Sequence, residues 1–188
     1  NSTSIWKRKE IIKLEMDKKP KILLDSDEIS KRIKELGDEI SKDYKDDDIV
    51  VISLLRGSFI FAADLVREIT IPLNVDFMTT SSYGHDEVSS GIVEIINDIR
   101  TSVKDKHVLI VDDIVDSGYT MKKVVEFVSM KEPKSVKICV MLDKPSRRKA
   151  DIEPDYVGFT IPDVFIVGYG LDYGDYYRNI PYVFTFDD

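Results

Sequence analysis

The stretch VLIVDDIVDSGYT, residues 108–120, contains the pattern that decides the fold class. Its first four residues are apolar and mostly β-branched, which predicts a buried strand over 108–111. Two adjacent acids, Asp112 and Asp113, follow directly, and a polar turn leads into a helical pattern over 119–130. A buried strand, a polar turn and a helix in immediate succession indicate part of a parallel β-α-β arrangement.

The rest of the chain alternates strands and helices in the same way. Continuous apolar runs predict strands, whereas apolar residues at three- and four-residue spacing predict helices. The expected strands are 49–55, 73–81, 92–96, 108–111 and 136–142, the expected helices are 25–44, 59–69 and 119–130, and a polar loop is expected over 84–90. This order predicts an α/β protein with a parallel sheet covered on both faces and ligands bound at the carboxyl ends of its strands.

Composition restricts the class of protein further. The chain has 188 residues, 43% of them hydrophobic, which suits one globular domain. No run approaches the ~18 apolar residues of a membrane span, and no apolar segment follows the basic cluster at 7–9, so we expect neither a membrane helix nor a secretory signal. The single cysteine, Cys139, lies in an apolar run and fits core packing in a reducing cytoplasm. The net charge of −8 argues against nucleic acid as the main partner.

The C-terminal segment 151–188 differs in composition from the rest of the chain. It holds eight acids against one base, Arg178, and ten of the eighteen aromatic residues. Aromatic side chains suit stacking on a flat ligand or packing against a partner subunit. We therefore expect a single domain over 1–188. A core over about 25–150 would carry a small hood over about 151–188, and residues 1–24 are candidates to contribute to that hood.

The turn after the acidic pair has the features of a site for a phosphate group. Gly118 lets the backbone turn tightly, so that successive N–H groups can point at one anion. Ser117 and Thr120 add hydroxyl donors, and the following helix presents the positive end of its dipole. The alternative interpretation is an ordinary polar turn in which Asp116 caps the helix.

Asp112 and Asp113 suit a different ligand chemistry. Neighbouring side chains on an extended backbone point to opposite sides, so at most one of the two should face the core. Carboxylates accept hydrogen bonds from sugar hydroxyls, and they bind Mg²⁺ directly or through water. A sugar phosphate would therefore use the whole stretch, with the acids on the hydroxyls and the glycine turn on the phosphate.

A second candidate anion site lies at 54–58, LLRGS, between a predicted strand and a predicted helix. Gly57 permits close approach of the backbone to a ligand, and Arg56 supplies positive charge. The alternative is an ordinary strand-to-helix turn. Lys144 and Phe165, two further candidates, also have plain alternatives, which are a solvated charge and core packing.

The stretch 108–120 resembles the phosphoribosyl-diphosphate binding motif of the type I phosphoribosyltransferases, and within them it is most similar to the hypoxanthine-guanine phosphoribosyltransferases. Supporting segments are SLLRGSFIFAADLVREI (53–69), VDFMTTSSYG (75–84), KICVMLDKPSRR (137–148) and VGFTIPDVFIVGYGLDYGDYYRNIPY (157–182). The resemblance implies the type I phosphoribosyltransferase fold, a mainly parallel twisted sheet flanked by helices, with a C-terminal hood over the carboxyl ends of the strands.

The resemblance also implies the roles of individual residues. The ribose and its phosphate would be bound by Asp112, Asp113, Asp116, Ser117, Gly118, Tyr119 and Thr120. Pyrophosphate would be bound by Arg56, Gly57 and Arg178, and the bond between Leu55 and Arg56 is the candidate for the cis peptide bond that the family often has there. The purine would contact Lys144, Phe165, Ile166 and Asp172, a lid would include Ser82 and Tyr83, and Mg²⁺ would be bound by Asp112, Asp113 and Asp172. Asp116 would be the general base at purine N7.

Lys144 determines the expected substrate preference. An ammonium group only donates hydrogen bonds, and hypoxanthine and guanine present an acceptor at position 6, where adenine presents an amino donor. The resemblance therefore implies purine salvage by Mg²⁺-dependent phosphoribosyl transfer to hypoxanthine or guanine, in the cytoplasm, by a homodimer or homotetramer. Two alternatives stay open, an RNA-binding regulator on the same fold and an enzyme that prefers xanthine or adenine.

Overall fold

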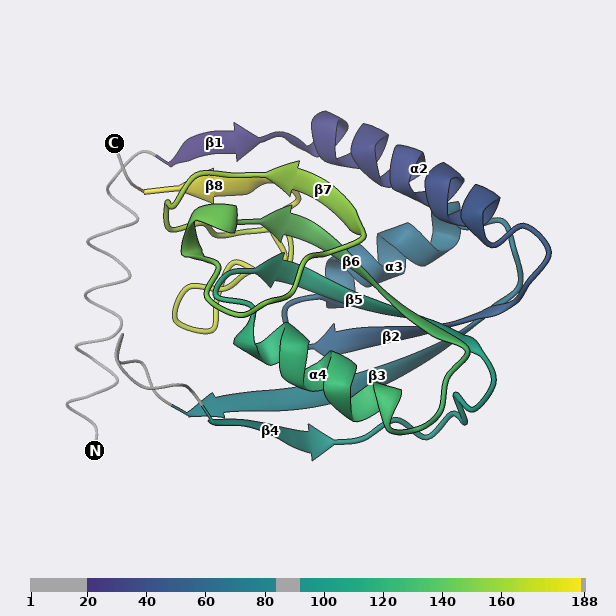
Figure 1. The fold of residues 1–188 in the computed structure, drawn as a ribbon. Coiled ribbons are helices and arrows are strands. Elements are labelled where there is room, and N and C mark those ends of the chain that lie inside the picture. Colours follow the sequence, from purple (N-terminus) through teal and green to yellow (C-terminus); the bar gives the residue numbers. More distant parts are fainter. Residues whose placement is uncertain (1–19, 84–91, 187–188) are drawn as a thin grey trace.

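The computed structural model describes residues 20–83 and 92–186 (Figure 1). Its main sheet has six strands in the order β4-β3-β2-β5-β6-β7. Neighbouring strands pair in parallel, except that β3 and β4 pair antiparallel. The predicted α/β class with a mainly parallel sheet is therefore confirmed. The bounds are β2 (Ile49–Leu55), β3 (Leu73–Tyr83), β4 (Ile92–Asn97), β5 (His107–Val115), β6 (Ser135–Asp143) and β7 (Tyr156–Thr160).

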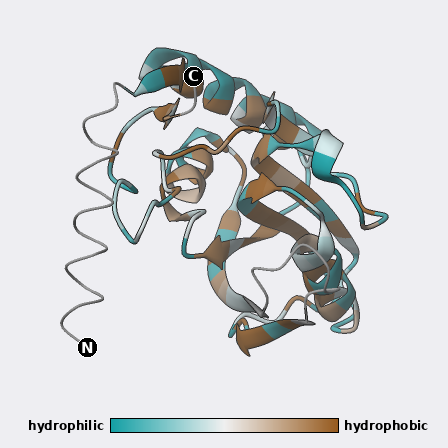
Figure 2. Ribbon diagram, turned by 90° about the vertical axis from the view of Figure 1, so that its left-hand side faces the viewer, coloured by the Kyte–Doolittle hydropathy of each residue, from teal (hydrophilic) through white to brown (hydrophobic). Residues whose placement is uncertain are grey.

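Helices cover both faces of this sheet, as predicted. The helices α2 (Ser26–Asp43) and α3 (Phe59–Glu68) lie on one face, and α4 (Tyr119–Ser129) lies on the other (Figure 1). Figure 2 shows apolar colour on the strands and polar colour on the outer sides of the helices. None of the helices in the described part of the chain is long and apolar enough to cross a membrane.

Two apolar cores result, one on each face of the sheet. Successive strand residues alternate between them, because side chains of a strand point to opposite faces. Val51 and Leu109 pack against α2 and α3, whereas Val50 and Ile110 pack against α4. Cys139 is fully buried in the first of these cores, which agrees with the packing role predicted for it.

Local sequence explains where α2 begins. The side chain of Asp25 accepts the backbone N–H groups of Asp27 and Glu28, each at 2.9 Å, and the Glu28 carboxylate accepts the N–H of Asp25 at 2.9 Å. This reciprocal capping box satisfies donors that a helix leaves unpaired at its start. The helix then buries one side of its surface in the core, and the predicted helix over 25–44 is confirmed to within one residue at each end.

The strand predicted over 108–111 is longer in the structure. β5 continues to Val115, so the acidic pair lies within the strand. The pairing of β5 with β2 stops at Val111, opposite Ser53, but the pairing with β6 continues to Val115, opposite Asp143. The prediction of a strand end at 111 is therefore wrong, because backbone hydrogen bonds to β6 extend the strand past its last purely apolar run.

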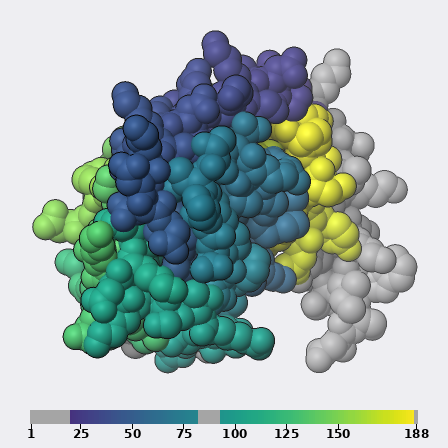
Figure 3. Space-filling model, turned by 90° about the vertical axis from the view of Figure 1, so that its right-hand side faces the viewer, coloured from purple at the N-terminus to yellow at the C-terminus, as the bar shows by residue number. Residues whose placement is uncertain are grey.

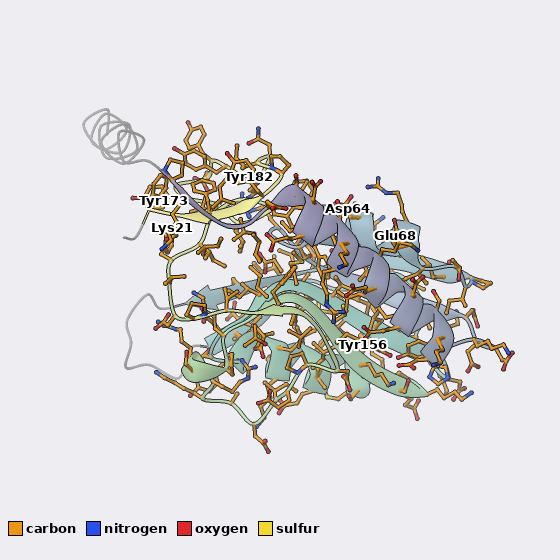
Figure 4. The ribbon with its side chains drawn as sticks, turned by 90° about the horizontal axis from the view of Figure 1, so that it is seen from above. Lys21, Asp64, Glu68, Tyr156, Tyr173 and Tyr182 are labelled. Carbon is orange, nitrogen blue, oxygen red and sulfur yellow. The ribbon has the colours of Figure 1, made fainter. Side chains whose placement is uncertain are left out.

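The two ends of the described chain form a second, two-stranded sheet. β1 (Lys21–Leu24) pairs antiparallel with β8 (Val183–Thr185). In the space-filling view of Figure 3 the C-terminal residues (yellow) lie below the N-terminal residues (purple) and beside α3 (blue-teal). Figure 4 shows Tyr173 and Tyr182 close to this sheet, where their rings pack edge to face on neighbouring aromatic rings. No strand was predicted for either segment, since both are too short for a clear pattern.

Candidate active site

Predicted functional residues lie where the parallel strands β2, β5 and β6 end. β2 leads into the glycine turn at Gly57, β5 into the turn that begins at Asp116, and β6 into Lys144. Because these strands are parallel neighbours, their carboxyl ends meet at one edge of the sheet. Three segments that are far apart in the sequence therefore share one site.

A pocket with a volume of about 130 Å³ lies between the end of β5 and the start of α4. Typical ligand pockets measure about 300–1,000 Å³, so this one suits a small chemical group. An α-helix leaves its first N–H groups without intrahelical partners, and α4 therefore directs donors at the pocket. The lining residues are Asp112, Ile114, Val115, Asp116, Ser117, Gly118, Thr120 and Met121.

The turn in front of this pocket requires glycine and is held by an arginine. Gly118 has a φ of +85°, and a Cβ atom there would lie 2.6 Å from Cγ2 of Ile152. Arg148 donates through Nη1 to the carbonyl oxygen of Asp116 at 2.8 Å and through Nε to that of Ile152 at 3.0 Å. It also forms a buried ion pair with Asp143. The backbone of the turn is thereby fixed through its carbonyl oxygens, which leaves its N–H groups available to a ligand in the pocket.

The acidic pair points to two parts of the site. Asp112 lines the pocket, whereas Oδ2 of Asp113 lies 1.8 Å from where a Cβ atom of Gly57 would be. Burial raises the pKa of both carboxyl groups, and the charge of Asp113 raises that of Asp112 further. Arg178 offsets part of the rise in the pKa of Asp113. A side-chain hydrogen bond between the two carboxyl groups also affects both pKa values, so the two side chains interact and do not fully diverge as predicted. Groups that stabilise negative charge, such as a cation or hydroxyl donors, would favour the ionised forms.

The turn after β2 presents backbone to the site. The peptide bond between Leu55 and Arg56, the candidate that the resemblance suggested, is cis. The hydroxyl of Ser58 is buried and hydrogen bonded to that of Ser53 at 2.7 Å, which ties the start of α3 to the strand. The side chain of Arg56 is 72% exposed and pairs with Asp175 at 3.6 Å. Its guanidinium group therefore lies at the rim of the site.

The C-terminal segment lies directly over this turn. A Cβ atom on Gly170 would come within 2.2 Å of the carbonyl oxygen of Gly57, and the φ of +97° at Gly170 also favours glycine. Arg178 donates through Nη1 to the carbonyl of Gly170 at 2.7 Å and pairs through Nη2 with Asp172 at 3.1 Å. These contacts bring the positive charge of Arg178 close enough to Asp113 to affect its pKa.

Lys144 combines a positive charge with near-complete burial. Its side chain is 8% exposed, and Nζ donates to the carbonyl of Val164 at 2.7 Å and lies 3.9 Å from Oδ1 of Asp163. A solvated surface charge is therefore the wrong interpretation. The adjacent Phe165 is 50% exposed, which also argues against simple core packing, whereas Ile166 is buried. A buried donor thus lies beside an accessible aromatic face.

Some predicted residues lie apart from the pocket. Tyr119 does not line it, and its side chain is partly exposed on the first turn of α4. Ser82 and Tyr83 are the last residues of β3. The polar loop expected over 84–90 lies outside the described residues. Tyr119 would therefore contribute to an anion site mainly through its backbone N–H at the start of α4.

The acids predicted to bind Mg²⁺ do not form a ready-made cluster. Among the described residues, no group of three or more histidine, cysteine or acidic side chains could hold a metal by itself. Asp172 pairs with Arg178, so Asp112 and Asp113 are the predicted Mg²⁺ ligands that are not paired with a basic side chain in the described part of the chain. Their donor set still fits Mg²⁺, which is commonly bound by one or two carboxylates together with substrate phosphates. Two buried carboxyl groups with raised pKa values are consistent with a site completed by a cation.

Three charged residues of the site were not predicted. Arg147 is the last residue of the short 3₁₀ helix η1 (Pro145–Arg147), and Arg148 follows it. Asp163 lies in the C-terminal segment. Arg147 Nε lies 3.4 Å from Oδ1 of Asp116, and its Nη1 lies 3.4 Å from Asp163. The adjacent arginines after Lys144 were the available signal, but the sequence does not indicate which partner each one has.

A comparison with protein families agrees with this geometry. Residues 21–174 match the model of the phosphoribosyl transferase domain. The chain is 50% identical over 163 residues to the hypoxanthine-guanine phosphoribosyltransferase of Bacillus subtilis, covering 87% of this chain and 91% of that protein. It is 51% identical over 164 residues to the hypoxanthine phosphoribosyltransferase of Salmonella typhimurium, covering 86% and 92%.

Solved structures give the same result. The structure of a hypoxanthine phosphoribosyltransferase from Staphylococcus aureus superposes with a TM-score of 0.86 at 44% identity, over 92% of this chain and 94% of that one. A ternary substrate complex of a mutant of the Trypanosoma cruzi enzyme gives a TM-score of 0.83 at 41% identity, over 88% and 94%. With the strand-end site described above, these matches show that the chain belongs to the hypoxanthine phosphoribosyltransferase family of type I phosphoribosyltransferases.

Proposed function

We propose that this chain transfers the phosphoribosyl group of 5-phospho-α-D-ribose 1-diphosphate to N9 of hypoxanthine or guanine and releases pyrophosphate. The observation that carries the proposal is the convergence of three parts at one sheet edge: the anion pocket after β5, the glycine turn at Gly57 and the buried Lys144. Relatives named hypoxanthine phosphoribosyltransferase at 50% and 51% identity support the same reaction.

The pocket after β5 is proposed to bind the 5′-phosphate of the sugar. Backbone N–H groups at the start of α4 and the hydroxyls of Ser117 and Thr120 would donate to its oxygens. Asp112 and Asp113 would accept from the ribose hydroxyls, because Asp112 lines this pocket and Asp113 lies against the turn at Gly57. The sugar would then span the gap between the two anion sites.

The pyrophosphate group is proposed to lie on the turn at Gly57. Backbone at Gly57 and the guanidinium of Arg178 would stabilise the negative charge that grows as the bond to C1 of the ribose breaks. Arg56 would contribute from the rim, once it leaves its ion pair with Asp175. Asp112 and Asp113 would hold Mg²⁺, which when bound neutralises charge on the departing pyrophosphate.

The purine base is proposed to lie between Lys144 and the ring of Phe165. Lys144 has three donors, of which the carbonyl of Val164 uses one, so another can reach the exocyclic oxygen of a 6-oxopurine. Phe165 offers an accessible face for stacking. Ile166, with its backbone, and Asp172 would contact the remaining edge of the base.

Asp116 is proposed to be the general base. The bond from C1 to pyrophosphate breaks as N9 attacks C1, and the proton on N7 passes to the carboxylate of Asp116. The same turn that would hold the sugar phosphate carries this carboxylate, which sets its position relative to the reacting atoms. Ser82 and Tyr83 would begin a lid that excludes water and prevents hydrolysis of the activated sugar.

We further expect a cytoplasmic enzyme that forms a homodimer or homotetramer. Val75 and Phe77 point to the same face of β3, since they are two residues apart, in the part of this strand that pairs only with β2, and they are 39% and 47% exposed. Exposed apolar side chains of this kind suit contact with a second copy of the chain. Light scattering on the purified protein tests this expectation, and a monomeric mass would contradict it.

The proposed reaction is tested by mixing the protein with phosphoribosyl diphosphate, Mg²⁺ and hypoxanthine and measuring the products. We expect inosine monophosphate and pyrophosphate in equal amounts, and no nucleotide when phosphoribosyl diphosphate is omitted. Failure of the folded protein to form the nucleotide from either hypoxanthine or guanine would overturn the proposal.

A further inference from the structure

Arg147 lies between two carboxylates at the entrance to the site. Its Nε is 3.4 Å from Oδ1 of Asp116, and its Nη1 is 3.4 Å from both carboxylate oxygens of Asp163. The side chain is 47% exposed and extends from the last residue of η1. The guanidinium group therefore bridges the turn after β5 and the C-terminal segment, two elements that would bind different parts of the substrates.

The two oxygens of the Asp116 carboxylate have different surroundings. Oδ1 is buried, and within the described residues no hydrogen bond reaches it, so Arg147 is its only charged neighbour at ion-pair distance. The side chain as a whole is 46% exposed, so the exposure belongs to its other atoms. One oxygen is thus buried beside Arg147, while the rest of the side chain is partly exposed and Asp116 lines the pocket.

Asp163 connects this pair to the residue proposed to select the purine. Its carboxylate lies 3.4 Å from Arg147 and 3.9 Å from Nζ of Lys144. Asp116, Arg147, Asp163 and Lys144 therefore form a continuous chain of alternating charges. Such a chain would orient the groups at both of its ends.

We propose that Arg147, anchored by Asp163, is a positioning residue for Asp116. By occupying Oδ1 it would hold the carboxylate plane so that Oδ2 faces N7 of the purine. The proposal rests on the assignment of Asp116 as the general base. A displacement of a catalytic group by about 1 Å can cost on the order of 10²-fold in rate, so a residue that only aims the carboxylate has a measurable effect.

The neighbouring arginine is a poor subject for this test, whereas Arg147 is a good one. Arg148 is buried and holds the backbone of the turn, so its removal would disturb the fold. Arg147 is half exposed, and its replacement leaves no apolar cavity. Lys149 provides a matched control, because it is an exposed cation two residues further on, and no ion pair of its side chain is found within the described residues.

The experiment compares Arg147→Ala, Arg147→Lys and Lys149→Ala in steady-state kinetics with hypoxanthine. We expect Arg147→Ala to lower kcat by about 10-fold to 100-fold, with KM for phosphoribosyl diphosphate changed by less than about threefold. Arg147→Lys should recover part of the loss, and so should guanidinium ion added to Arg147→Ala at a non-denaturing concentration. Lys149→Ala should match the wild-type protein.

A second comparison separates this proposal from the assignment of the base. In an Asp116→Asn background, Arg147→Ala should cause no further loss, because no carboxylate is left to position. A full additional loss there, or a kcat for Arg147→Ala equal to that of Lys149→Ala, would overturn the positioning role while the base assignment stands. Near-normal turnover by Asp116→Asn alone would instead remove the base assignment, and the positioning role with it.

Discussion

Gly57→Ala tests whether the glycine turn after β2 sets the position of Asp113. A Cβ atom on residue 57 would lie 1.8 Å from Oδ2 of Asp113 and 2.8 Å from its Cγ. Real Cβ contacts essentially never fall below 3.0 Å, so the carboxylate must move by about 1.2 Å. Since a displacement of about 1 Å in a catalytic site can cost on the order of 10²-fold, we expect kcat/KM for phosphoribosyl diphosphate to fall by about that factor.

The variant should lose activity much more than stability. The group that the new methyl meets is the end of one side chain, which can rotate away, whereas a new methyl on Gly37 would lie 2.5 Å from Cβ and 2.7 Å from the backbone oxygen of Glu68. Overpacking of that kind costs about 1–3 kcal/mol, of which about 1 kcal/mol is recovered by the higher helix propensity of alanine. Gly37→Ala is thus the control, with reduced stability and normal kcat/KM.

The assay combines steady-state kinetics with urea unfolding of both variants and of Asp113→Ala. If displacement of Asp113 causes the loss, Gly57→Ala should have little further effect in the Asp113→Ala background. A kcat/KM for Gly57→Ala within threefold of the wild-type value would refute the reasoning, and so would losses that simply add in the double variant.

Three further results are expected. Asp116→Asn should lower kcat on the order of 10²–10⁴-fold while binding of phosphoribosyl diphosphate, measured by calorimetry, is retained; near-normal turnover would exclude Asp116 as the base. Lys144→Met should lower kcat/KM for hypoxanthine on the order of 10²-fold, because the donor to the 6-oxygen is lost, and an unchanged value would contradict the proposed contact. The carboxylate of Asp76 accepts the backbone N–H groups of Phe77, Arg100 and Thr101, each at 2.7 Å, and although burial opposes the effect these bonds lower the pKa of Asp76. The stabilising effect of the ionised Asp76 is therefore present above the ordinary pKa of about 3.9 and is lost as pH falls further. Asp76→Asn should reduce the free energy of unfolding by about 1–3 kcal/mol at pH 7 and by less below about pH 4. A reduction that does not depend on pH would contradict this.

Local patterns allowed the turn after β5 and the turn at Gly57 to be predicted. Each combines an apolar strand, a glycine and a helix start within a dozen residues, and the physical reasons for these residues are local. The C-terminal end of β5 was harder to predict, because the pairing of β5 with β6 continues through Asp112 and Asp113 after the apolar run has ended. Strand length there depends on the partner strand, which the sequence of 108–120 does not contain.

Long-range partners could not be predicted in the same way. β1 and β8 have four and three residues, and their pairing joins Lys21 to Thr185 across almost the whole chain. Arg147 and Arg148 are identical neighbours in the sequence, yet one bridges two carboxylates at the entrance and the other is buried behind the turn. The geometry of η1 determines this difference, and no periodic pattern encodes it.

The central claim, transfer of phosphoribosyl to a 6-oxopurine chosen by Lys144, is tested most directly by measuring kcat/KM for hypoxanthine, guanine, xanthine and adenine side by side with phosphoribosyl diphosphate and Mg²⁺. We predict that hypoxanthine or guanine is the best substrate and that adenine is used at least about 10³-fold less efficiently, because its amino group would face the ammonium of Lys144, donor against donor. Adenine as the best substrate would contradict the account.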